Sequence, residues 1–217
     1  MAYGIWHMEN DTPAAQSQTL TLSHQKLKAL QPELYSSRGW RKFLRENGYR
    51  LSSPDEAADH WKDYVAENLR SGDCEAAVVI SDSPLLIAAY AGELDCVALL
   101  GFPGGFATKY DLKTGSRLLA VNFYLEWNFF LPEDLTPGPR QTGKYRNFAP
   151  LIAEFLTDDA EIIEHEKAEI TQSEWRRAET LGEEYLKQNG EKARDGRPLL
   201  CHLPAKAAKA PAKTRKR

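Results

Sequence analysis

The expected fold depends on one stretch of the chain, residues 76–125, AAVVISDSPLLIAAYAGELDCVALLGFPGGFATKYDLKTGSRLLAVNFYL. It contains five short apolar segments, and the linkers between them are only a few residues long. Linkers of this length leave no room for a crossover helix, so consecutive strands should run antiparallel. The stretch therefore predicts a five-stranded antiparallel meander. Its strands are expected at Ala76–Ser81, Leu85–Ala91, Asp95–Phe102, Phe106–Leu112 and Ser116–Leu125.

The first three predicted strands are almost continuously apolar, which is typical of strands that are covered on both faces. Small side chains at Ala88, Ala89 and Ala98 would allow a helix to approach the sheet closely. The fourth predicted strand, Phe106–Leu112, alternates in polarity and should be half exposed. Residues 113–115, Lys-Thr-Gly, are then expected to form the tip of a hairpin.

Helices are expected on the N-terminal side of this stretch, within residues 23–70. Ser53 and Glu56 have the spacing of a capping box, and Pro54 suits the first turn, so a helix should begin there. An earlier helix over about 33–47 should present a basic face, which we expect to be solvated. Contact with nucleic acid or an acidic partner is the alternative use of that face. Its basic residues are Arg38, Arg41, Lys42 and Arg45.

Helices are also expected within residues 150–189, and the predicted fold class is therefore α+β. Residues 158–170 are compatible with either a strand or a helix. Thr171 and Glu174 form a second capping-box pattern. Residues 198–204, called the C-terminal segment below, are apolar enough to dock on the body. The helix that begins after Thr171 should bury Trp175, Ala178, Leu181, Gly182 and Tyr185.

Composition places the chain among cytoplasmic globular proteins. Its 217 residues fit one domain, and 42% apolar residues are enough for a core. We expect no membrane span, because no run approaches the ~18 apolar residues that a spanning helix needs. We expect no signal peptide, because the first residues lack a basic start and an apolar run. Three widely spaced cysteines without a C-x-x-C pattern fit a reducing compartment.

The charge is distributed unevenly along the chain. Residues 205–217 carry six basic groups and no acidic one, whereas the rest holds 22 basic and 31 acidic residues. We expect residues 1–204 to form a single domain with a loosely ordered start at 1–22, and 205–217 to be a disordered tail. The tail could bind polyanions such as nucleic acid weakly and without sequence preference. Folding back onto the acidic residues 158–169 and a purely solubilising role are the alternatives. The basic tail residues are Lys206, Lys209, Lys213, Arg215, Lys216 and Arg217.

Motifs that carry known chemistry are absent from the sequence. It has no Walker-type loop, no G-x-G-x-x-G, no H-E-x-x-H and no G-x-S-x-G. The histidines and cysteines show no metal-ligand spacing, so no metal and no cofactor are predicted. Asp82 and Asp95 bracket the second predicted strand and should lie on the order of 23 Å apart, at opposite ends of the sheet. They are therefore not expected to act as a pair.

The predicted meander brings several polar groups to one end of the sheet. A glycine-rich turn, residues 101–105, would lie there beside Asp82, and the cationic loop over 132–148 would leave from the same end. Backbone amides and cations together could receive an anion such as a phosphate or a carboxylate. The alternative is that the glycines and prolines only turn the chain. The candidate anion-binding residues are Asp82, Gly104, Gly105, Glu126, Arg140, Lys144 and Arg146.

Two functions are compatible with these features. The missing catalytic set and the uneven charge favour a binding or adaptor module, whose body contacts a protein and whose tail binds polyanions. The alternative is a small enzyme that acts on a phosphorylated or anionic substrate at the sheet end near Asp82 and Arg140. No membrane partner is expected.

Overall fold

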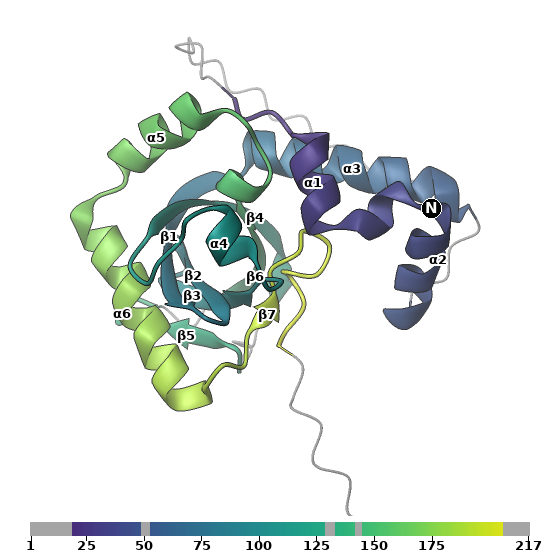
Figure 1. The fold of residues 1–217 in the computed structure, drawn as a ribbon. Coiled ribbons are helices and arrows are strands. Elements are labelled where there is room, and N and C mark those ends of the chain that lie inside the picture. Colours follow the sequence, from purple (N-terminus) through teal and green to yellow (C-terminus); the bar gives the residue numbers. More distant parts are fainter. Residues whose placement is uncertain (1–18, 49–52, 129–132, 142–144, 206–217) are drawn as a thin grey trace, which may run out of the picture.

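The fold is a curled, largely antiparallel sheet surrounded by helices (Figure 1). The computed structural model describes residues 19–48, 53–128, 133–141 and 145–205. The described helices are α1 (His24–Leu30), η1 (Pro32–Tyr35), α2 (Ser37–Glu46), α3 (Pro54–Ser71), α4 (Phe106–Lys109), η2 (Ala153–Phe155), α5 (Ala160–Glu169) and α6 (Gln172–Asn189). The described strands are β1 (Asp73–Asp82), β2 (Leu85–Ala91), β3 (Cys96–Gly101), β4 (Arg117–Asn128), β5 (Leu135–Pro137), β6 (Tyr145–Ile152) and β7 (Arg194–Asp195).

The α+β class is confirmed, but the sheet has seven strands instead of five. The strand order is β5-β3-β2-β1-β4-β6, and the short β7 pairs with β3 in parallel. Along the described part of the chain, no helix is long and apolar enough to cross a membrane.

The centre of the sheet follows the sequence pattern. β1, β2 and β3 are antiparallel neighbours, with Val78 opposite Ala88 and Ala88 opposite Leu99. Every residue of β2 is buried, as are five of the six residues of β3. The prediction that the apolar strands are covered on both faces is therefore confirmed.

The predicted strand Phe106–Leu112 is wrong, because this segment begins with the short helix α4. Gly105 precedes the helix with a φ of 89°, a left-handed conformation that turns the chain out of the sheet. Phe106 and Tyr110 then lie one helical turn apart, and their rings pack on Phe155 at centroid distances of 5.3 and 4.6 Å. The alternation of apolar residues also satisfies i, i+4 spacing, and packing on Phe155 favours the helix.

The meander is also wrong beyond β3, because β4 crosses the sheet and pairs with β1. The turn at 113–115 lies beside β1, where the Gly115 amide donates to the Val79 carbonyl and the Val79 amide donates to Ser116. Residues after β4 that read as irregular or helical form β5 and β6, which extend the two sides of the sheet. Residues 158–170, left open by the sequence, contain α5.

Helix α6 covers the outer face of the sheet, as Figure 1 shows at the left of the view. Thr171 and Glu174 form the predicted capping box, and α6 buries the five residues expected of it. Close packing occurs at Gly182, where a Cβ atom would lie 2.5 Å from the Ala88 Cβ and 2.9 Å from Ile80. The opposite face is covered by α1, η1, α3 and the C-terminal segment. Helix α3 begins at Pro54 as predicted, but the Ser53 side chain makes no capping hydrogen bond.

A buried arginine connects the two sides of the curled sheet. Arg194 lies in β7 on the β3 side, and its guanidinium donates to the Phe148 carbonyl of β6 (3.2 Å). Its Nε and Nη2 donate to the two carboxylate oxygens of Asp134 at 2.8 and 3.2 Å. The exposed fractions of these two side chains are 0% and 2%. Arg194 therefore holds β7, β6 and the start of β5 in one arrangement.

Gly182→Ala tests the close approach of α6 to the sheet. Glycine to alanine usually favours a helix, but here the added methyl group meets Ala88 and Ile80. We expect the free energy of unfolding to fall by about 1–3 kcal/mol, the usual cost of overpacking. Gly104→Ala is the control, because nothing lies within 4 Å of its Cβ position. Urea unfolding measures both, and a stabilised Gly182→Ala protein would contradict this packing.

Candidate functional site

The structure does not bring the predicted anion-binding residues together. Asp82 ends β1 opposite Leu85, and Gly104 and Gly105 follow β3 at that same end of the sheet. Arg140 lies at the other end, where its backbone amide donates to Asp95 at 2.6 Å. Because β4 starts beside the end of β1, the chain leaves β4 at the end opposite to the predicted one.

The other candidates of this set add nothing at the Asp82 end. Glu126 and Arg146 lie in β4 and β6, whose pairing at Trp127 and Arg146 is at the end of the sheet opposite to Asp82. The side chains of Glu126 and Arg146, like all of Lys144, lie outside the described residues. The six basic tail residues, within 206–217, also lie outside the described residues. The expected separation of Asp82 from Asp95 is confirmed, since Asp82 opposes Leu85 and Ala91 opposes Cys96.

Asp95 joins three parts of the chain, which the sequence did not predict. Its carboxylate accepts from Tyr90 Oη (2.7 Å), from the Arg140 amide (2.6 Å) and from Arg177 Nη1 of α6 (3.1 and 3.2 Å). Burial favours its neutral form, but the bonds from Tyr90 and Arg140 and the charge of Arg177 lower the pKa of Asp95 overall. With both oxygens occupied, Asp95 serves to fix the β2–β3 turn, the β5 loop and α6.

Glu154 is a half-buried carboxyl that the sequence also missed. Its two oxygens accept from the Leu119 amide of β4 at 3.2 and 3.1 Å, and Lys167 Nζ of α5 lies 3.7 Å away. Burial raises the pKa of Glu154 to about 7. The half-buried Glu75 behaves in the same way, with its pKa raised by burial to about 7. Glu154 accepts from an amide of β4, and Glu75 accepts from the Gly92 amide in the turn between β2 and β3.

Glu154→Gln should reverse a pH-dependent loss of stability. The folded protein binds this proton more tightly than the unfolded chain, so the contribution of Glu154 falls as the pH rises from about 4.5 to about 7. Glutamine keeps the acceptor for Leu119 without the buried charge. We expect it to raise the free energy of unfolding at pH ~8, by at most on the order of 3 kcal/mol, and to leave it nearly unchanged at pH ~4.

The control for this prediction is Glu161→Gln, an exposed carboxyl on α5. Urea unfolding across the pH range compares the three proteins. A Glu154→Gln protein that parallels the parent protein at every pH would contradict the assigned environment of Glu154.

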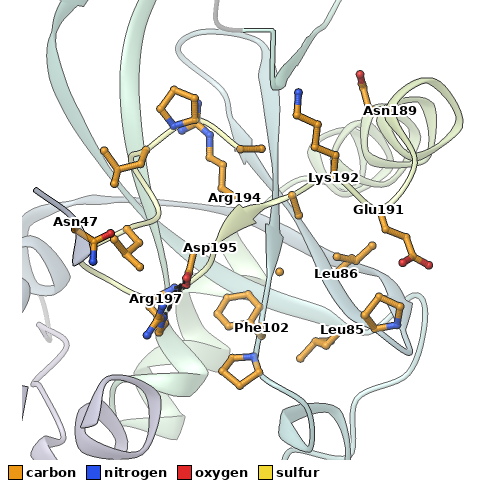
Figure 2. Close-up of a pocket in the computed structure, with 18 of the residues that line it drawn as sticks. Asn47, Leu85, Leu86, Phe102, Asn189, Glu191, Lys192, Arg194, Asp195 and Arg197 are labelled. Carbon is orange, nitrogen blue, oxygen red and sulfur yellow. Dashed lines mark hydrogen bonds and ion pairs between the residues drawn. The ribbon is translucent and has the colours of Figure 1, made fainter. Parts of the chain in front are cut away.

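An open groove of about 960 Å³ lies on the described surface (Figure 2) and is called the C-terminal groove below. Three parts of the chain form it: the end of α2, the β2–β3 region at the Asp82 end of the sheet, and residues 189–205. Its charged lining residues are Glu46, Glu191, Lys192, Arg194, Asp195 and Arg197. Its apolar lining residues include Leu85, Leu86, Phe102, Leu200 and Leu203.

Ion pairs fix the wall of this groove. Arg197 Nε and Nη2 donate to Asp195 at 2.9 and 2.7 Å, and its Nη1 donates to Glu33 of η1 at 2.8 Å (Figure 2 shows Asp195 and Arg197 side by side). Arg194, between α6 and this pair in the chain, directs its guanidinium away to Asp134. Residues 194–197 of the wall are therefore bonded to Asp134 through Arg194 and to Glu33 through Arg197.

Basic residues occur close in the chain to two parts of the groove lining. Helix α2, whose end lines it, exposes the four basic residues Arg38, Arg41, Lys42 and Arg45. The basic tail starts directly after Ala205, which also lines the groove. The predicted docking of the C-terminal segment is confirmed, with Leu199, Leu200 and Cys201 buried. That docking was the only sign of the groove in the sequence, because its three parts are far apart along the chain.

Comparison of the chain with family models, curated proteins and solved structures found no match. Among the side chains that the structure describes, no group of three or more His, Cys, Asp or Glu residues could hold a metal ion. The geometry of the groove is therefore the basis for a functional proposal.

Proposed function

We propose that this chain is a protein-binding module, and that the C-terminal groove receives an extended segment of a partner protein. The observation that carries the proposal is the groove itself, about 960 Å³ in volume, with apolar side chains beside charges of both signs. Apolar anchors surrounded by polar groups are typical of protein contact surfaces. The groove is open to the surface, as an extended chain would require.

The partner segment that fits is apolar in its centre and acidic in its flanks. Leucine and phenylalanine side chains in the groove suit an apolar anchor. Helix α2, which exposes four basic residues, contributes its end to the groove lining, and the tail with its six basic residues begins at Ala205. Complementary charge of this kind increases association rates and selects partners. The tail would add a salt-sensitive attraction for polyanions.

An enzyme acting on an anionic substrate is less well supported. It was expected to combine Asp82 with Arg140, and these residues lie at opposite ends of the sheet. Asp95 is bonded by three side-chain or backbone donors, and Glu154 by the Leu119 amide. The carboxylates of Asp95 and Glu154 are thus used to stabilise the fold.

Selection from a random-peptide library displayed on phage tests the groove. We expect the selected peptides to combine apolar residues with Asp and Glu, and Leu203→Asp to weaken their binding by about tenfold or more in fluorescence anisotropy. Leu203 is a half-buried residue that lines the groove and also packs against the core. Leu22→Asp is the matched control, at a half-buried leucine that does not line the groove.

The same peptides distinguish the contribution of the groove to binding from the contribution of the tail. Removal of residues 206–217 should weaken binding at low salt and reduce its salt dependence, while Leu203→Asp should weaken binding at every salt concentration. Peptides that bind equally well to the parent and Leu203→Asp proteins would contradict the groove. Selected peptides without acidic residues would contradict the stated partner chemistry.

A further inference from the structure

We infer that a second hollow, between α3, β6 and the C-terminal segment, binds a small uncharged ring compound with one hydrogen-bonding group. This cavity has a volume of about 230 Å³ and is separate from the C-terminal groove. Leu199 and His202 line the cavity, whereas Leu200 and Leu203 line the groove, so the C-terminal segment contributes to both. The inference does not depend on the proposed protein-binding function.

The walls of the cavity suit a flat apolar molecule. Trp61 and Tyr64 of α3 line it with rings in an edge-to-face arrangement, 5.3 Å apart between centroids. Val65, Ala149 and Leu151 supply aliphatic surface. Protein interiors are normally packed closely, and voids much larger than a water molecule are few. The small side chain of Ala149 leaves this space open, and an apolar cavity of similar size is known to take up a benzene-sized molecule.

His202 supplies the polar group of the cavity. It is half-buried, and within the described residues its imidazole has no hydrogen-bond partner. Burial and the nearby charge of Arg194 lower the pKa of His202, so the ring is neutral near neutral pH and has one donor and one acceptor. Tyr64 and Asn68 also line the cavity and interact with each other. A single N–H or O–H on the ligand would therefore find its partner at His202.

Binding of indole and of indene, its analogue without the N–H, tests the inference on the full chain. Methyl NMR spectra should shift at Val65, Ala149 and Leu151 on addition of either compound, with indole bound about tenfold more tightly. Ala149→Leu should fill the cavity and abolish both sets of shifts. His202→Phe should remove the preference for indole and retain indene. Ala107→Leu, on α4, is the matched control and should change neither titration.

Several results would overturn the inference. These are no shift at the three methyl groups with saturating indole, shifts located elsewhere, and equal binding of indole and indene to the parent protein. Circular dichroism shows whether the Ala149→Leu protein folds. If it does not fold, the binding of indole and indene to the His202→Phe protein tests the inference instead. Peptide binding at the C-terminal groove should be the same in all folded variants, which distinguishes failure at this cavity from failure of the groove.

Discussion

The buried ion pair between Arg194 and Asp134 is the interaction on which the periphery of this fold depends. Two charges removed from water are costly unless their hydrogen-bonding groups are satisfied. Here the guanidinium makes a bidentate contact with Asp134 and also donates to the Phe148 carbonyl, and Asp134 accepts from the Ala205 amide at 2.7 Å. The pair therefore joins β7, β6, the residues before β5 and the end of the C-terminal segment.

Both candidate binding sites follow from this connection. The central strands are buried on both faces, and only their ends at Leu85, Leu86 and Gly101 line the C-terminal groove. Both candidate sites lie where the C-terminal segment meets the sheet and the N-terminal helices. The C-terminal groove lies along one part of the segment, and the smaller cavity beside α3 lies along another. A stable position of this segment is thus a condition for either kind of binding.

Local patterns in the sequence predicted the local parts of the structure. Short linkers correctly made β1, β2 and β3 antiparallel neighbours, and the capping box and apolar spacing correctly placed α6 with its buried face. The segment at Phe106 failed because alternating residues also satisfy helical spacing, and that single error reversed the direction assigned to β4. As a consequence, Asp82 and Arg140 were expected at one end of the sheet, whereas they lie at opposite ends. Arg194 and Asp134 are 60 residues apart, and no local pattern marks either one as buried.

Hydrogen exchange of the C-terminal segment in an Arg194→Met protein tests the central role of this pair most directly. The amides of Leu200, Cys201 and Leu203 are hydrogen-bonded in the segment, so their exchange reports its opening. Loss of the arginine leaves Asp134 buried without its charge partner. We predict that these amides exchange at least about a hundredfold faster, corresponding to roughly 3 kcal/mol, while those of β1 and β2 stay protected. Unchanged exchange in the segment would contradict the account.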